Sequence, residues 1–256
     1  MHIEIVGNGA PLVLIHGWAM HSGLFAPLTR VLAARFAVHL VDLPGHGRSR
    51  DDAAFDLQTI LAGLIERIPD GAVWAGWSLG GMIALHAAQQ APARIRAVAA
   101  IASNPRFVSA DDWPHGVPAQ VFEQFGAGLE RDFTATVERF LALEAMGSAH
   151  AGTELRTLRA QAFEHGPPEL AALRQGLALL QAGDLREAVA KLAMPSLWIA
   201  GRRDRLVPPQ AMRWAADAAP RAHYLELDTG HMPFLAEPDA VAEALMALDN
   251  GSHASR

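Results

Sequence analysis

The sequence predicts an α/β protein, a mostly parallel and doubly wound sheet that is interrupted by an inserted helical cap. Three observations support this fold class. Short apolar runs alternate with helical patterns up to residue 105, the alternation stops over residues 106–186, and it then resumes. The length of 256 residues suits one large domain with an insertion, and the apolar share of 51% is enough for a sizeable core.

The strands of the sheet are predicted by short continuous apolar runs. Such runs are typical of parallel strands that are covered on both faces, because neither face needs polar side chains. A last strand is expected shortly before His231. The other predicted strands cover residues 11–16, 37–41, 72–75, 97–102 and 196–200.

Helical patterns connect these strands and fill the interruption. Before the interruption we expect helices at 24–35, 57–68 and 79–90, the second capped by Asp56. Within residues 106–186 no strand pattern is found, and helical patterns occur at 136–146, 155–163 and 170–180. The first of these places Val137, Phe140, Leu141 and Glu144 on one face.

These patterns divide the chain into two parts. We expect residues 1–105 and 187–256 to form the α/β core, which ends in a helix at 238–248, and residues 106–186 to form the cap. The final segment, NGSHASR, is expected to be a frayed polar tail.

The composition excludes several classes of protein and site. With 21 basic and 27 acidic residues the net charge is −6, which argues against a nucleic-acid partner. The absence of cysteine excludes disulfides, thiolate nucleophiles and cysteine-ligated metals. No apolar stretch is long enough to span a membrane, and the N-terminal segment MHIEIVGNGAPLVLIHG lacks the features of a signal peptide. The sequence therefore predicts a cytoplasmic protein.

A glycine-rich turn between a strand and a helix carries the main functional signal. The segment has the pattern G-x-S-x-G, in which a tight turn projects a serine above the carboxyl edge of the sheet. The N–H of the following residue, Leu79, opens the next helix and suits a developing oxyanion. A serine that is incidental to a glycine-rich turn is the alternative. The residues are Gly76-Trp77-Ser78-Leu79-Gly80-Gly81.

A serine hydroxyl needs a histidine as its base and a carboxylate that orients the histidine. In α/β folds with this serine turn, the carboxylate follows the serine along the chain and the histidine follows the carboxylate. Asp204 follows the strand at 196–200, and His231 follows the last strand, so both are expected at the edge that carries Ser78. Asp228 is too near His231 on the same turn. Three other residues are not predicted to belong to the triad. Glu226 lies within a strand, Asp42 is expected to hold a loop, and His16 is expected to shape the oxyanion loop.

These residues and their order resemble the α/β-hydrolase superfamily over nearly the whole chain. The resemblance implies that the N–H of Trp18 is the second oxyanion donor, beside that of Leu79. The segments that carry it are His16-Gly17-Trp18, Asp42-Leu43-Pro44-Gly45-His46-Gly47-Arg48-Ser49, the serine turn, Gly201-Arg202-Arg203-Asp204 and Gly230-His231.

The chain is similar in particular to the family of esterases that act on the methyl ester of pimeloyl-acyl carrier protein in biotin synthesis. The segment Thr136-Val137-Glu138-Arg139-Phe140-Leu141-Ala142-Leu143, followed by Met146-Gly147, carries this likeness outside the core. The resemblance implies that substrate contacts fall on Trp18, Ser78, Leu79, Phe140, Leu141, Ala142, Leu143, Glu144 and His231. It also implies that cap arginines hold the acidic carrier protein, here Arg139, Arg156 and the nearby Arg159.

The sequence departs from that family at a few cap positions. Ala135 and Gly152 stand where the family has basic residues, and Glu144 stands where it has an uncharged amide. The leading hypothesis, which includes the substrate that the resemblance implies, is a monomeric serine esterase that cleaves the methyl ester of pimeloyl-acyl carrier protein without a metal or organic cofactor. In this hypothesis Ser78 attacks the ester, His231 is the base and Asp204 orients the imidazole of His231. A generalist short-chain esterase or carbon–carbon bond hydrolase is the second hypothesis, and a non-catalytic ligand receptor is the third.

Overall fold

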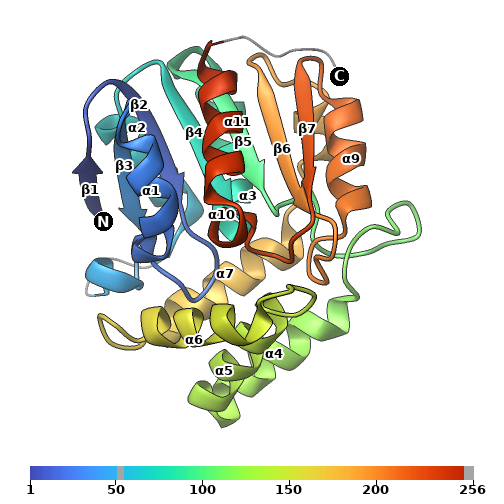
Figure 1. Ribbon diagram of the computed structural model, residues 1–256. Coiled ribbons are helices and arrows are strands. Elements are labelled where there is room, and N and C mark those ends of the chain that lie inside the picture. Colours follow the sequence, from blue (N-terminus) through green and yellow to red (C-terminus); the bar gives the residue numbers. More distant parts are fainter. Residues whose placement is uncertain (51–54, 251–256) are drawn as a thin grey trace.

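A single mixed sheet forms the centre of the computed structural model, which describes residues 1–50 and 55–250 (Figure 1). Its seven strands lie in the order β1-β3-β2-β4-β5-β6-β7, and only the edge strand β1 is antiparallel to its neighbour. This architecture confirms the predicted fold class. The strands are β1 (His2–Val6), β2 (Ala10–Ile15), β3 (Phe36–Asp42), β4 (Ala72–Trp77), β5 (Ile95–Ile101), β6 (Ser196–Gly201) and β7 (Ala222–Leu227).

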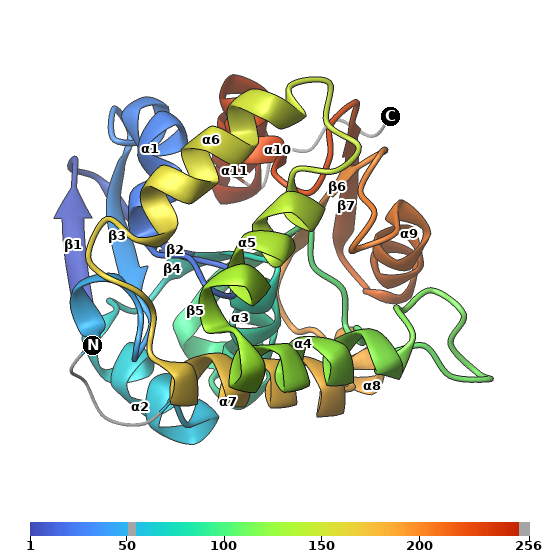
Figure 2. The ribbon, with the colours of Figure 1, turned by 90° about the horizontal axis from the view of Figure 1, so that it is seen from below.

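Helices cover both faces of the sheet, which explains why every residue of β4 and β6 is buried. On one face α1 (Ala26–Leu32), preceded by the short η1 (Ser22–Phe25), packs on α11 (Pro238–Asn250) (Figure 1). On the other lie α2 (Leu57–Arg67) and α3 (Leu79–Gln90), which pack on each other (Figure 2). Asp56 caps α2 as predicted, because its carboxylate accepts the N–H of Thr59 at 2.8 Å.

A layer of four helices lies beyond one end of the sheet (Figures 1 and 2). It lies at the carboxyl end of the parallel strands, since Trp18, just after β2, donates its indole N–H to the carbonyl of Leu173 in α7 at 2.8 Å. The ligand-binding edge of the sheet is therefore covered by this layer. The helices are α4 (Ala119–Arg131), α5 (Phe133–Glu144), α6 (Ala151–Ala162) and α7 (Leu170–Ala182).

Shorter helices complete the chain near the strand ends. They are η2 (Gly47–Ser49), η3 (Pro92–Arg94), α8 (Arg186–Val189) and α10 (Pro233–Ala236). The longer α9 (Pro209–Ala218) packs on β6 and β7.

Apart from the short helices η2, η3, α8 and α10, three elements have no counterpart among the sequence predictions. The strand β1 lies at the edge of the sheet and its Ile5 is 59% exposed, so it lacks the buried apolar run by which the other strands were recognised. The helix α4 contains Gly126 and Gly128, which weaken a helical pattern. The third is α9, a short helix whose buried residues are Ala211, Met212 and Ala215, so that its apolar pattern rests mostly on small alanines.

Between β5 and α4 the described chain forms only isolated bridges, Val108 with Val117 and Ala110 with Trp113, and no strand. Most of the tail that was expected to fray, residues 251–256, lies outside the described residues. Among the helices of the described chain, none combines the length and the apolar character needed to cross a bilayer.

Candidate active site

The serine turn has the strained geometry that its glycines make possible. Ser78, between β4 and α3, has φ 52° and ψ −117°, a conformation that costs a residue with a side chain about 1–3 kcal/mol. A Cβ on Gly76 would lie 2.1 Å from the carbonyl oxygen of Gly80, and one on Gly80 would lie 2.1 Å from that of Ile15. Both positions therefore need glycine, and β2, β4 and α3 meet at the serine because of it.

The structure brings Asp204 and His231 into direct contact. Their side chains are buried, and the Nδ1 of His231 lies 2.7 Å from Oδ2 of Asp204. Since a carboxylate can only accept, Nδ1 carries a proton, and in the neutral ring Nε2 therefore has the lone pair. This Nε2 atom is buried and has no hydrogen-bond partner in the described chain. The histidine is thus an unpaired acceptor, which is the state a general base requires.

Hydrogen bonds from the backbone fix the carboxylate of Asp204. Its Oδ1 accepts the N–H groups of Leu206 at 2.8 Å and of Val207 at 3.0 Å, while Oδ2 faces His231. Each oxygen therefore has a set task. The loop after β6 thus holds the acid in place, and no lysine or arginine of the described chain pairs with this carboxylate.

Trp77 links His231 to the serine turn, a role that sequence reasoning missed. Its indole N–H donates to the carbonyl oxygen of His231 at 2.8 Å, and the two rings lie 5.5 Å apart. Because Trp77 directly precedes Ser78, this contact places the histidine loop beside the serine. The only signal in the sequence is that a tryptophan stands inside the G-x-S-x-G motif.

The competing acids have other partners. Asp228 is exposed and forms ion pairs with Arg202 at 2.7 Å and Arg203 at 3.2 Å. Glu226 accepts the hydroxyl of Tyr224 at 2.7 Å. The third, Asp42, accepts the N–H groups of Ser22 and Arg48 and so holds a loop, as its sequence context indicates. None of these acids contacts His231 in the described chain.

His16 is buried and occupied on both sides of its ring. Its Nδ1 lies 2.7 Å from the carbonyl oxygen of Gly17, and Nε2 accepts the N–H of Leu43 at 2.9 Å. Burial lowers the pKa of His16 to about 3, so the ring is neutral, as this bonding pattern requires. Such a histidine joins two loops and has no free nitrogen for proton transfer.

The two backbone donors expected for an oxyanion are unoccupied. Neither the N–H of Trp18 nor that of Leu79 has an acceptor among the described residues. Leu79 is the first residue of α3, so the positive end of the helix dipole lies there. Two free N–H groups next to a serine suit the stabilisation of negative charge on a carbonyl oxygen.

Aromatic side chains join the cap to this site. The ring of Trp18 lies 4.6 Å from that of Phe140 in α5 and 6.5 Å from that of Phe125 in α4. The stretch at 140–144 that is expected to contact substrate lies on α5, and its side chains differ in burial because they point to different sides of that helix. Phe140, Leu141 and Glu144 are buried, Leu143 is half-buried and Ala142 is exposed.

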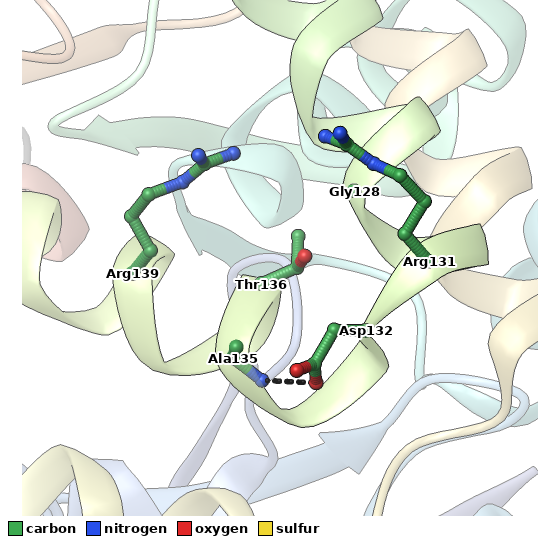
Figure 3. A pocket seen from close by; sticks show the side chains of 6 residues that line it. All are labelled: Gly128, Arg131, Asp132, Ala135, Thr136 and Arg139. Carbon is green, nitrogen blue, oxygen red and sulfur yellow. Dashed lines mark hydrogen bonds between the residues drawn. The ribbon is translucent and has the colours of Figure 1, made fainter.

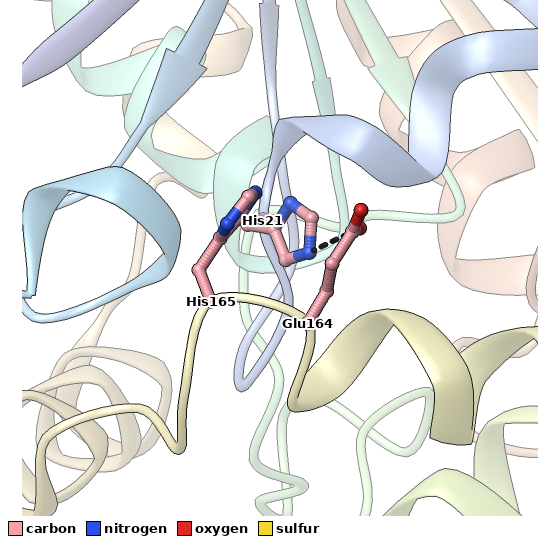
Figure 4. Close-up of side chains that lie close together, drawn as sticks. All are labelled: His21, Glu164 and His165. Atoms are coloured by element: carbon pink, nitrogen blue, oxygen red, sulfur yellow. Dashed lines mark ion pairs between the residues drawn. The ribbon is translucent and has the colours of Figure 1, made fainter.

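One cluster has the composition of a metal site (Figure 4). The ring of His165 lies 4.9 Å from that of His21, and Glu164 lies 3.6 Å from Nε2 of His21. However, Nδ1 of His21 accepts the N–H of Gly23 at 3.1 Å, and Nε2 lies 2.8 Å from the carbonyl of Gln161. Because both nitrogens are occupied, the trio serves to join η1 to the connection between α6 and α7.

The three arginines expected to hold a partner differ in their surroundings. The guanidinium of Arg139 lies 5.0 Å from the ring centre of Phe125, and Arg156 donates to the hydroxyl of Thr153 at 3.0 Å. Arg159 instead forms an ion pair with Glu138 at 2.6 Å. Its charge is therefore compensated within the cap, whereas no carboxylate of the described chain pairs with the other two.

Curated proteins of one name are similar to the chain over almost its whole length. The chain is 54% identical over 247 residues to a protein of Xanthomonas campestris named pimeloyl-[acyl-carrier protein] methyl ester esterase, covering 96% of this chain and 97% of that one. It is 55% identical over 246 residues to a protein of the same name from Stenotrophomonas maltophilia, and the match covers 96% of this chain and 95% of that protein.

Solved structures share the fold. An esterase from Exiguobacterium antarcticum is similar with a TM-score of 0.86 at 20% identity, over 97% of this chain and 95% of that one. An enol-lactonase from Burkholderia xenovorans is similar with a TM-score of 0.84 at 21% sequence identity, over 96% of this chain and 95% of the lactonase. The profile described as alpha/beta hydrolase fold matches residues 10–238. The chain therefore belongs to the α/β-hydrolase family, together with the pimeloyl-[acyl-carrier protein] methyl ester esterases that it resembles over almost its whole length.

Proposed function

We propose that the chain is a serine carboxylesterase that hydrolyses the methyl ester of pimeloyl-acyl carrier protein to the free acid and methanol in biotin synthesis. The observation that carries this proposal is the identity of 54% over 96% of the chain with an esterase of that name. The free Nε2 of His231, oriented by Asp204, supports ester hydrolysis independently.

The proposed reaction uses the side chains described above. Ser78 Oγ attacks the ester carbonyl while Nε2 of His231 takes its proton, and the N–H groups of Trp18 and Leu79 hold the oxyanion. The tetrahedral intermediate collapses as His231 returns the proton to the leaving methanol. Water then attacks the acyl-serine, again with His231 as base, and releases the carboxylic acid and free Ser78. Asp204 stabilises the imidazolium in both steps.

A shallow pocket on the cap supports binding of the acidic carrier protein. It has a volume of about 380 Å³ and lies at the corner between α4 and α5, where Arg131 and Arg139 flank Thr136 (Figure 3). Asp132, its acidic residue, already caps α5 through the N–H of Ala135 at 3.0 Å. Sequence reasoning missed Arg131, which has no carboxylate partner in the described chain, and this arginine replaces Arg159 in the binding surface we propose.

Reversing the charge of this pocket is expected to weaken carrier binding. The double variant Arg131→Glu and Arg139→Glu should raise KM for the carrier-bound ester about tenfold, because two favourable charges become repulsive. Hydrolysis of a small free ester should change little, since the catalytic groups are untouched. The control is Arg30→Glu, on α1 and away from the cap. An equal loss of hydrolytic activity on the carrier-bound ester and on the small free ester would contradict a docking role. It would indicate that the two arginines support the fold.

Complementation tests the whole proposal. The gene should restore growth to a biotin auxotroph that lacks this esterase, and the Ser78→Ala variant should not. Turnover of a short p-nitrophenyl ester without complementation would favour a generalist esterase, and no turnover of any ester would favour a receptor. The proposal places the reaction in the cytoplasm and requires only one chain, because every proposed catalytic residue belongs to it.

A further inference from the structure

Glu144 is a buried carboxyl group that the proposed mechanism does not use. It is the last residue of α5, its exposed fraction is 0%, and it lies on the buried face of the helix with Val137 and Leu141. Neither carboxylate oxygen has a hydrogen-bond partner in the described chain. A charged carboxylate is strongly disfavoured in such surroundings, whereas a protonated carboxyl group is tolerated far better.

The end of α5 lies directly against the two loops that carry Asp204 and His231. A Cβ on Gly147 would lie 2.1 Å from the carbonyl oxygen of Arg203, the residue before Asp204. One on Gly230, the residue before His231, would lie 3.2 Å from the carbonyl oxygen of Met146. These approaches of backbone to backbone leave little room for the end of α5 to move independently of the catalytic loops.

The charges around Glu144 oppose its ionisation. Burial raises the pKa of Glu144 well above its usual value, and the nearby carboxylate of Asp204 raises it further. The other charged groups on the adjoining elements have partners of their own. Arg203 pairs with Asp228, and Glu154 on α6 accepts the hydroxyl of Ser148 at 2.7 Å. No cation of the described chain therefore pairs with Glu144.

We propose that Glu144 is a positioning residue, a neutral carboxylic acid that lets the end of α5 pack against the loops of Asp204 and His231 and loosens this packing when it ionises. The residue acts through the loops and transfers no proton in the reaction. Only the kinetic test of this inference rests on the proposed function. Its effect on unfolding holds whatever the substrate is.

The unfolding test follows from proton linkage. Because folding raises the pKa of Glu144, the folded state keeps a proton that the unfolded state has lost, and stability falls as pH rises from the unfolded pKa through the folded pKa. In that interval, above about pH 4.5, each pH unit should raise the unfolding equilibrium constant of the wild type about tenfold relative to that of Glu144→Gln. Denaturant unfolding at several pH values measures this difference.

Two further variants make the unfolding test decisive. Glu144→Met removes the ionisable group without adding an unpartnered amide, so it should show the same shallower pH dependence even if the glutamine variant folds poorly. Glu123→Gln on α4 removes an exposed carboxyl group and should follow the wild type. If the curves of the wild type and both Glu144 variants run parallel with pH, Glu144 is ionised in the folded protein and the inference is wrong.

The kinetic test uses a small ester. In the wild type, kcat/KM should decline as the pH rises through the range in which Glu144 ionises, mainly through kcat, because the ionisation disturbs the Asp204–His231 pair. In Glu144→Gln this decline should disappear. A residue that merely fills space would change the rate equally at every pH, and that result would overturn the positioning role.

Discussion

Ser78→Ala is expected to lower the turnover of any ester substrate by about 10⁴- to 10⁶-fold, the range seen when one member of a catalytic triad is removed. The reason is that the variant removes the hydroxyl group that we propose as the nucleophile, while the N–H groups of Trp18 and Leu79 remain and sustain a residual rate. Steady-state kinetics on a p-nitrophenyl ester measures the loss.

The same variant should stay folded, because the side chain of Ser78 makes no hydrogen bond in the described chain. Ser78→Gly should unfold at a higher temperature than the wild type, since glycine relieves the strain at φ 52°. A fluorophosphonate probe should label the wild type and neither variant. Ser109→Ala, outside the site, is the matched control and should keep both labelling and turnover. Substantial turnover in Ser78→Ala would exclude this serine as nucleophile.

The contact between Asp204 and His231 could be predicted because the fold brings their loops to one edge of the sheet. Parallel strands have their carboxyl ends at one edge of the sheet, so residues that follow β4, β6 and β7 must come near one another. The rejection of Asp228 also followed from local spacing. Its pairing with Arg202 and Arg203, in contrast, depends on how two loops meet, and the sequence does not show that.

The cap could be predicted less well, because its contacts join helices that are distant in sequence. Glu138 on α5 compensates the charge of Arg159 on α6, and Arg131 on α4 shares a pocket with Arg139 on α5. No pattern along one helix reveals which charge on another will lie beside it. The helical period did place Glu144 on the buried face, but whether its oxygens find partners depends on the loops of the core.

Asp204→Asn is expected to lower kcat/KM by about 10⁴-fold with little change in structure. The reason lies in how the two carboxylate oxygens are used. Oδ1 accepts two backbone N–H groups, from Leu206 and Val207, so the carbonyl oxygen of an asparagine must take that place. Its NH₂ group then faces Nδ1 of His231, where Oδ2 accepts a hydrogen bond from Nδ1–H in the wild type.

An amide that donates to Nδ1 forces the histidine proton onto Nε2, the nitrogen that must accept the proton of Ser78. The imidazole keeps its position and loses its function as a base. Asp228→Asn is the matched control, because that exposed side chain pairs only with Arg202 and Arg203 in the described chain, and its loss should cost less than about tenfold. Kinetics on one small ester, with thermal unfolding of both variants, decides between the two acids. If Asp228→Asn were the inactive variant and Asp204→Asn the active one, the carboxylate that orients His231 during turnover would be Asp228, and the hydrogen bond of Asp204 would be structural.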